Sequence, residues 1–216
     1  MTDNKDLMKI GVLVSGGGTN LQALIDKVHG KDGDIVLVLS DKENAYGLER
    51  ARKAGIPAQF VPDTDEAGRK TGAEAFNAEM IRRLKEAGVE LVVLAGYMKI
   101  VPESFVSAFP ERIINIHPAL IPSFCGEGYY GLRVHQAAID YGVKLSGATV
   151  HFVSAQADAG PVIAQKAVPV YPDDTPETLQ QRILAEVEHV LLPGVTSAIC
   201  RGRVHLNGRT VTVDPE

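Results

Sequence analysis

The chain has 216 residues, 45% of them hydrophobic and 23% charged, which is the size and composition of one ordinary globular domain. The formal net charge of −5 favours neither a nucleic-acid-binding surface nor contact with an anionic membrane, so we expect a small-molecule ligand. The two cysteines, Cys125 and Cys200, lie far apart and outside any C-x-x-C pattern, which indicates neither a disulfide framework nor a cysteine-based zinc site.

Short runs rich in Val, Ile and Leu alternate with longer amphipathic segments in the first half of the chain. This alternation predicts βα units and a parallel sheet. The predicted strands cover 10–14, 35–39, 59–61 and 89–95, and the predicted helices cover 20–28, 45–54 and 73–87. The last of these strands is almost continuously apolar, so we expect it to be covered on both faces and to lie centrally in the sheet.

The second half continues with a strand over 113–116, which ends in His117-Pro118. Further predicted elements are an irregular loop over 118–131, a helix over 134–141, strands over 149–153 and 162–170, a polar loop over 154–160 and a helix over 177–199. Pro193 is expected to kink or split that last helix. Asn207-Gly208 predicts a hairpin within 203–213. No linker composition divides the chain, so we expect a single domain over 1–216, with a flexible N-terminus over 1–8 and a C-terminal hairpin or tail over 203–216.

The segment Ser15-Gly16-Gly17-Gly18-Thr19-Asn20 joins the first predicted strand directly to the first predicted helix. Backbone N–H groups and the positive end of the helix make such a junction a site for anions. Glycines let the backbone approach an oxyanion closely, and Ser15, Thr19 and Asn20 offer side-chain donors or a helix cap. We therefore predict phosphate binding here, against the simpler interpretation of a capped tight turn.

The identity of the phosphate ligand stays open at this point. A Walker A motif is absent, because no Gly-Lys-Ser or Gly-Lys-Thr follows the glycines. A dinucleotide-binding fingerprint matches in part: Gly16 and Gly18 fit its first two glycines, and Asp41 ends the second strand where a ribose-binding acid would lie. Leu21 occupies the position of its third glycine. A regulatory or redox domain that binds NAD is thus an alternative.

Asn115 and His117 lie two residues apart at the end of a predicted strand, so their side chains point to the same face. Open α/β sheets bind ligands at this carboxyl end of their strands. Asp158, in the loop 154–160, reaches the same edge if the flanking strands are neighbours. An Asn amide and a protonated His can stabilise an oxyanion, while an Asp orients the imidazole or relays a proton. The alternative is that His117 is a buried structural histidine.

Four segments carry a resemblance to a known family: Ser-Gly-Gly-Gly-Thr-Asn-Leu-Gln at 15–22, Leu-Ala-Gly-Tyr-Met-Lys-Ile at 94–100, Asn-Ile-His-Pro-Ala-Leu-Ile-Pro at 115–122 and Gly-Ala-Thr-Val-His-Phe-Val at 147–153. Over about residues 9–199 the chain resembles the folate-dependent phosphoribosylglycinamide formyltransferases of purine biosynthesis. The resemblance implies the formyltransferase fold, a Rossmann-like α/β fold with an open, mostly parallel twisted sheet and helices on both faces. It also implies transfer of a formyl group from the co-substrate 10-formyltetrahydrofolate to the amine of glycinamide ribonucleotide.

The resemblance further implies roles for individual residues. The catalytic residues would be Asn115, His117 and Asp158. The ribonucleotide phosphate would contact Gly16, Gly17, Gly18, Thr19 and Asn20, and Glu188, before His189, would lie at the substrate amine. Folate would lie against Tyr97, Met98, Lys99, Ile100 and Val101, and against the loop leading to Asp158. No metal is expected, because the chemistry needs none and because His135 and His151 lack metal-ligand spacing with His117.

The chain also departs from the pattern of this family. Ala73 stands where many members carry an Arg, and Arg69 or Lys70 is a candidate substitute for it. Ala119 stands where many members carry Ser. The stretch 124–131 is longer than in many members and is expected to reshape the rim of the pocket.

Two related activities are disfavoured. Hydrolases of 10-formyltetrahydrofolate usually carry an extra N-terminal regulatory domain, whereas the first predicted strand here starts at residue 10. Methionyl-tRNA formyltransferases carry a further nucleic-acid-binding domain, and the acidic charge also disfavours RNA as partner. We expect a cytoplasmic monomer or homodimer that contacts neither nucleic acid nor membrane, since the longest apolar stretch, near 91–94, is too short to span a bilayer.

Overall fold

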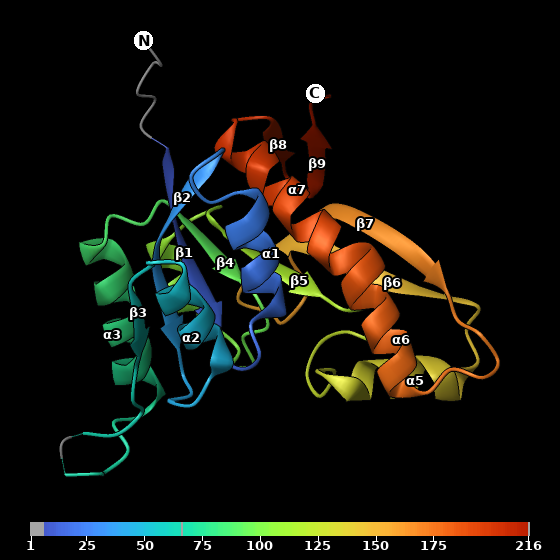
Figure 1. Ribbon diagram of the computed structural model, residues 1–216, viewed down its shortest axis with the longest axis horizontal. Helices are drawn as coiled ribbons and strands as arrows, with labels where there is room; N and C mark the ends of the chain where they lie inside the picture. The colour runs from blue at the N-terminus through green and yellow to red at the C-terminus, as the bar shows by residue number, and fades with distance from the viewer. Residues whose placement is uncertain (1–6, 66, 216) are drawn as a thin grey trace.

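The computed structural model describes residues 7–65 and 67–215, and within them seven strands form one sheet (Figure 1). Across the sheet the strands are β3 (Ala58–Phe60), β2 (Gly33–Ser40), β1 (Met8–Val14), β4 (Leu91–Leu94), β5 (Ile113–His117), β6 (Leu145–Phe152) and β7 (Val162–Pro169). The first five are parallel to one another, and β6 runs antiparallel to both β5 and β7. The predicted mostly parallel α/β sheet is confirmed, and β4 is its middle strand, as predicted.

Helices cover both faces of this sheet (Figure 1). One face carries α1 (Thr19–Lys27), α2 (Tyr46–Lys53), α6 (Pro176–Ile183) and α7 (His189–Cys200). Helix α5 (Leu132–Tyr141) lies beside α6. The other face carries α3 (Ala73–Glu86) and α4 (Glu103–Ala108). Alternate residues of β4 enter the two cores: Val93 packs with α1 and α7, while Val92 packs with α3 and α4. This two-sided burial explains why the strand is apolar along its whole length.

Several element boundaries differ from the predicted ones. Strand β6 begins at Leu145 rather than at 149, and helix α4 was not predicted. Three small residues, Ser146, Gly147 and Ala148, follow Leu145 at the start of β6, and such a composition indicates a turn. They form a strand because they pair with β7, and a Cβ on Gly147 would overlap the Lys166 carbonyl of that strand. Strand β1 starts at Met8, inside the predicted flexible N-terminus, and residues 1–6 lie outside the described residues.

The last helix is interrupted earlier than Pro193 predicts. A π-helical segment, η1 (Leu184–Glu188), separates α6 from α7, and Pro193 lies inside α7. Proline has no N–H, so the carbonyl of His189, four residues earlier, lacks its helical donor. Lys27 Nζ donates to that carbonyl oxygen at 2.6 Å and replaces the missing bond. The widened π turn places Glu188 at its end, facing α1.

The helical segment Pro176–Cys200 is long and apolar enough to cross a membrane, judged by length and composition alone. It is the single such helix in the described part of the chain. Half of its most apolar window is buried inside the protein. Leu192 and Thr196 are fully buried, and Leu192 belongs to the core on the α1 face of the sheet. Packing on the sheet accounts for the apolar composition of this helix.

The predicted C-terminal hairpin is present as β8 (Val204–Asn207) and β9 (Thr210–Val213); because Asn207 pairs with Thr210, the turn between them is Gly208-Arg209, one residue later than the predicted Asn207-Gly208. Its tip reaches the loop between β6 and β7, where Arg209 Nη1 donates to the Ala159 carbonyl at 3.0 Å. The hairpin therefore contacts the loop that carries Asp158.

Candidate active site

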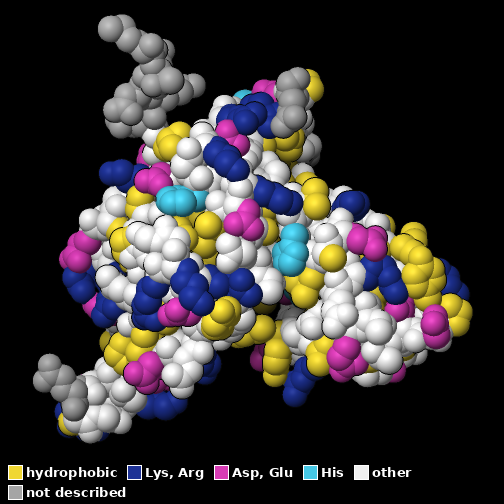
Figure 2. All heavy atoms as spheres, in the orientation of Figure 1, with side chains coloured by type: hydrophobic (Ala, Val, Ile, Leu, Met, Phe, Trp, Pro, Cys, Tyr) yellow, Lys and Arg dark blue, Asp and Glu magenta, His cyan; other side chains and the backbone are white. Residues whose placement is uncertain are grey.

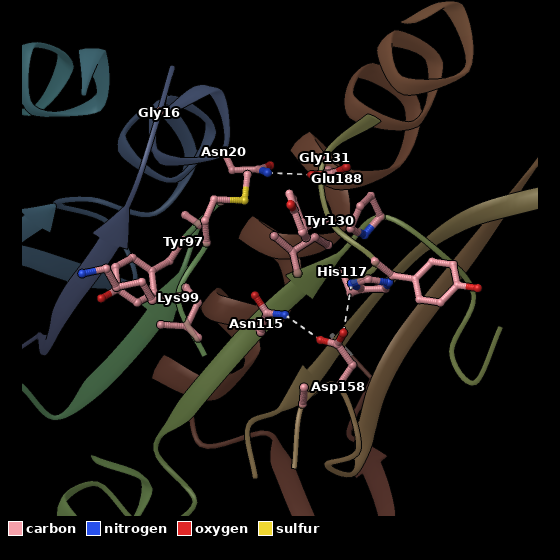
Figure 3. Close-up of a pocket in the computed structure, with 18 of the residues that line it drawn as sticks. Gly16, Asn20, Tyr97, Lys99, Asn115, His117, Tyr130, Gly131, Asp158 and Glu188 are labelled. Atoms are coloured by element: carbon pink, nitrogen blue, oxygen red, sulfur yellow. Dashed lines mark hydrogen bonds and ion pairs between the residues drawn. The ribbon is translucent and has the colours of Figure 1, made fainter. Parts of the chain in front are cut away.

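A cavity of about 500 Å³ opens at the carboxyl ends of β1, β4 and β5. The glycine loop, the segment after β4, the end of β5 and the Asp158 loop all contribute to its walls (Figure 3). All the residues to which the family resemblance assigned a catalytic or binding role line it: Gly16, Gly17, Gly18, Thr19, Asn20, Tyr97, Met98, Lys99, Ile100, Val101, Asn115, His117, Asp158 and Glu188. Parallel strands end at the same edge of a sheet, which is why segments far apart in sequence meet here.

The glycine loop differs from the predicted loop in how the helix begins. The N-cap of α1 is Gly18, in the left-handed region with φ 69°, and no side chain caps the helix. A Cβ on Gly18 would lie 2.6 Å from the Cα of Gly47, so α2 packs directly against the loop. The predicted capping by Ser15, Thr19 or Asn20 is wrong, because backbone packing determines this turn.

Ser15 ties the glycine loop to the segment after β4. Its Oγ donates to Asp41 Oδ1 at 2.6 Å and accepts from the Met98 N–H at 2.9 Å. Asp41 is buried and does not line the cavity. The carboxylate that a dinucleotide-binding domain would use for a ribose therefore has a structural partner here, which disfavours the NAD alternative.

Asn115 lies opposite His151 in the antiparallel pairing of β5 with β6. Its Nδ2 is 3.2 Å from His151 Nε2 and 3.5 Å from Asp158 Oδ1. His151 Nδ1 lies 2.8 Å from the Phe152 carbonyl, which can only accept, so Nδ1 carries the hydrogen. In the neutral ring Nε2 then accepts from Asn115, and His151 orients the Asn115 amide.

His117 and Asp158 both line the cavity and point toward each other (Figure 3). His117 Nδ1 lies 3.5 Å from Asp158 Oδ2. His117 Nε2 lies 2.8 Å from the Phe124 carbonyl and therefore carries a hydrogen. The Gly126 N–H donates to Asp158 Oδ2 at 2.9 Å. The predicted trio of Asn115, His117 and Asp158 is thus brought together, and the loop after β5 holds two of its members.

The charges of this pair follow from burial and from their neighbours. Burial lowers the pKa of His117, and the Asp158 carboxylate and the Phe124 carbonyl offset only part of that effect. Burial alone would raise the pKa of Asp158, but the His151 and His117 rings, in their protonated forms, and the Gly126 N–H bring it below its ordinary value. At neutral pH the pair is therefore a neutral imidazole beside a carboxylate. This differs from the protonated His117 that the sequence predicted.

Glu188 is 5% exposed and lies at the opposite end of the cavity, where its Oε2 accepts from Asn20 Nδ2 at 2.6 Å (Figure 3). This hydrogen bond joins α1 to the end of η1. Burial raises the pKa of Glu188 to about 7, although the hydrogen bond from Asn20 acts in the other direction. The carboxyl group therefore ionises nearer to neutral pH than an ordinary glutamate does.

Glu188→Gln is expected to stabilise the protein at high pH and not at low pH. Because the pKa of Glu188 is raised in the folded state, ionising it costs stability as the pH rises from about 4.5 towards and above 7. The glutamine keeps the shape without that cost, so the free energy of unfolding should rise by at most about 3 kcal/mol at pH 8.5. Denaturant unfolding at pH 5 and pH 8.5 measures this, with the exposed neighbour Glu186→Gln as control. An equal change at both pH values would contradict it.

The segment 97–101 forms an apolar lip of the cavity. Met98 and Ile100 are 55% and 60% exposed, while Val101 is buried in the core with α3 and α4. Burial raises the pKa of the Tyr97 hydroxyl. Lys99 Nζ lies 3.9 Å above the Phe76 ring and 3.9 Å from Asp63. Exposed apolar side chains at a cavity mouth suit a flat aromatic ligand.

Two histidines of the site were not predicted to take part in it. His151 orients Asn115, as described above. His135, on α5, is fully buried and lines the cavity, and neither of its ring nitrogens has a hydrogen-bond partner among the described residues. Burial lowers the pKa of His135 to about 4. The sequence indicated a role for neither histidine beyond a possible metal ligand. Only the place of His151 in the segment 147–153 indicated that it belongs to the site.

The structure locates two of the departures from the family pattern. Ala73 is the first residue of α3, and neither Arg69 nor Lys70 lines the cavity, because Arg69 pairs with Asp65 and Lys70 lies 3.7 Å from Asp63. The structure therefore gives no support to either as a substitute for an arginine at that position. In the stretch 124–131, Phe124 packs against the Tyr129 and Tyr141 rings, and residues 126–131 line the cavity as its rim.

Comparison with known proteins places these features in a family. A sequence model of the formyl transferase family matches residues 8–196. The chain is 43% identical over 202 residues to the chloroplastic phosphoribosylglycinamide formyltransferase of Arabidopsis thaliana, covering 91% of this chain and 66% of that protein. It is 39% identical over 209 residues to the phosphoribosylglycinamide formyltransferase of Escherichia coli, covering 96% and 94%. It spans only 14% of the trifunctional purine biosynthetic protein of Drosophila melanogaster, at 41% identity.

Solved structures agree with this assignment. The chain superposes with a TM-score of 0.88 on glycinamide ribonucleotide transformylase 1 from Symbiobacterium toebii, at 45% identity, covering 99% of this chain and 97% of that one. A formyltetrahydrofolate deformylase from Pseudomonas syringae is more distant, with a TM-score of 0.82 and 30% identity, and the match covers 96% of this chain and 66% of the deformylase. The chain belongs to the formyl transferase family, among the phosphoribosylglycinamide formyltransferases.

Proposed function

We propose that this protein transfers the formyl group of 10-formyltetrahydrofolate to the amine of glycinamide ribonucleotide in purine biosynthesis. One observation carries the proposal: a single cavity contains a glycine loop at a helix N-terminus, the apolar lip 97–101 and the Asn115, His117 and Asp158 side chains. The glycine loop suits the phosphate of the acceptor, and the lip suits the pteridine of the donor.

In the proposed reaction, the amine nitrogen attacks the formyl carbon, and the bond from that carbon to N10 of the folate breaks. The amine loses a proton and N10 gains one. Asn115 lines the cavity, and the Nδ2 hydrogen that it does not donate to His151 can be donated to the formyl oxygen, on which negative charge develops. His117 and Asp158, a neutral base beside a carboxylate, are placed to receive and return the proton. We propose that Glu188 lies against the amine end of the ribonucleotide.

Gly17→Leu is expected to raise the KM for the ribonucleotide about tenfold or more, with a smaller effect on kcat. A Cβ on Gly17 meets no protein atom within 4 Å, and the residue lines the cavity, so a larger side chain would occupy the space of the phosphate. Steady-state kinetics measure the effect. Gly194→Leu is the control, because Gly194 also has open space around its Cβ position but lies outside the cavity. An unchanged KM for Gly17→Leu would place the phosphate elsewhere.

Hydrolysis of 10-formyltetrahydrofolate is the second candidate, because one structural relative is a deformylase. Water as acceptor leaves the phosphate-binding geometry of the glycine loop without a purpose, which favours the transferase. Formation of tetrahydrofolate with and without glycinamide ribonucleotide separates the two activities. Turnover that depends on the ribonucleotide supports the transferase, and equal turnover in both conditions supports the hydrolase.

We further propose that residues 1–216 act as one domain on small-molecule substrates in the cytoplasm. The two free cysteines are compatible with a reducing compartment such as the cytoplasm. A similar plant protein is chloroplastic. Fractionation of the source cells tests the location. Sedimentation of the purified protein distinguishes the monomer from the homodimer.

A further inference from the structure

The carbonyl groups of the glycine loop face helix α2. The Gly47 N–H donates to the Gly16 carbonyl at 3.0 Å, and Arg50 Nε donates to the Gly17 carbonyl at 2.7 Å. A Cβ on Gly47 would lie 2.9 Å from Val14 Cγ2, and a Cβ on Gly18 would lie 2.6 Å from the Gly47 Cα. The first turn of α2 is therefore in direct backbone contact with the rear of the loop.

These contacts determine where the N–H groups of the loop point. In a planar trans peptide the carbonyl oxygen and the next N–H point in opposite directions. Because the carbonyls of Gly16 and Gly17 face α2, the N–H groups of Gly17 and Gly18 face away from it, on the side of the cavity that both residues line. Neither N–H donates to another group in the part of the chain that the structure describes. They are available to an anion.

The cavity supplies little positive charge for a phosphate of roughly −1.5 to −2. Lys99 is the single Lys or Arg in its lining among the described residues, and its ammonium lies beside Asp63. Arg50 provides a charge from behind the loop. Its guanidinium is half-buried, with Nη1 3.2 Å from Gln22 Oε1, and it lies 5.0 Å from the Tyr46 ring centroid. No carboxylate of the described residues forms an ion pair with it, and basic side chains gather over α2 (Figure 2).

We propose that Arg50 is a positioning residue for the acceptor phosphate: it fixes the Gly17–Gly18 peptide with its N–H towards the cavity and contributes the positive charge behind that peptide. A charged donor on the Gly17 carbonyl also polarises the peptide, which makes the Gly18 N–H a stronger donor. This role of Arg50 rests on the proposed function, because it concerns how the glycine loop binds the phosphate of the acceptor.

Arg50→Gln is expected to raise the KM for glycinamide ribonucleotide about tenfold, while kcat stays within about twofold and the KM for 10-formyltetrahydrofolate is unchanged. Arg50→Lys, which keeps the charge and one hydrogen bond, should recover part of the loss. The control is Arg52→Gln, which removes the same charge from an exposed position of the same helix and should leave the kinetics unchanged.

Glycinamide riboside, which lacks the phosphate, distinguishes positioning of the phosphate from a general structural role. Its kcat/KM should be equal in wild type and Arg50→Gln, because the phosphate is the group on which Arg50 acts. An equal loss for the riboside and the ribonucleotide, or an equal effect of Arg52→Gln, would overturn the proposal. Calorimetric binding of inorganic phosphate gives a readout independent of turnover, and Arg50→Gln should weaken it; unchanged binding would also overturn the proposal. Absence of formyl transfer by the wild type would instead contradict the proposed function.

Discussion

Asp158→Asn is expected to lower kcat by on the order of 10²–10³-fold and to leave ribonucleotide binding nearly unchanged. Asp158 contacts His117, His151 and Asn115 within 3.5–3.6 Å, whereas the glycine loop lies elsewhere on the cavity wall. Asparagine keeps the size but removes the negative charge, so His117 loses the group that stabilises its protonated form as the proton moves.

Asparagine is the appropriate replacement because Asp158 has φ 51°, in the left-handed region that Asn and Asp tolerate better than other residues with a Cβ. Its amide oxygen can still accept from the Gly126 N–H, so the loop keeps that bond. Steady-state kinetics and calorimetric binding of the ribonucleotide are measured together, with the exposed Asp173→Asn as control. A near-wild-type kcat in folded Asp158→Asn protein would refute the role, and lost ribonucleotide affinity would make Asp158 a substrate ligand.

Asn115→Ala is expected to lower kcat by a similar factor, on the order of 10²–10³-fold, because it removes the side-chain donor to the developing oxyanion. His117→Ala should cost about as much. Since Asn115 Nδ2 and His117 Nδ1 both lie 3.5 Å from Asp158, the three side chains should act as one unit. The double variant Asn115→Ala with Asp158→Asn should then lose much less than the product of the two single losses. Multiplicative losses would show that the residues act independently.

The parts of the site that follow from local geometry could be predicted from the sequence. Period-two alternation places Asn115 and His117 on one face, and a glycine run between a strand and a helix predicts an anion site. Because β4 is apolar on both faces, its central place was also predictable. Each of these inferences uses neighbours within one strand or one strand–helix junction.

The parts that depend on packing between distant segments could not be predicted. The partner of Asn115 is His151, which is set by the antiparallel register of β6 against β5. The N-cap at Gly18 follows from contact with Gly47 of α2, and the buried Glu188 follows from the π turn that precedes α7. The pKa of His117 is lowered because its burial in the folded protein outweighs the effect of the nearby Asp158 carboxylate.

The most direct test of the central claim follows the formyl carbon itself. Purified protein is incubated with 10-formyltetrahydrofolate labelled with ¹³C at the formyl carbon, together with glycinamide ribonucleotide, and the products are identified by NMR. The site described here predicts that the label appears in the N-formyl amide of the ribonucleotide, and that Asp158→Asn slows its appearance on the order of 10²–10³-fold. Label recovered as free formate at the same rate with or without the ribonucleotide would contradict formyl transfer.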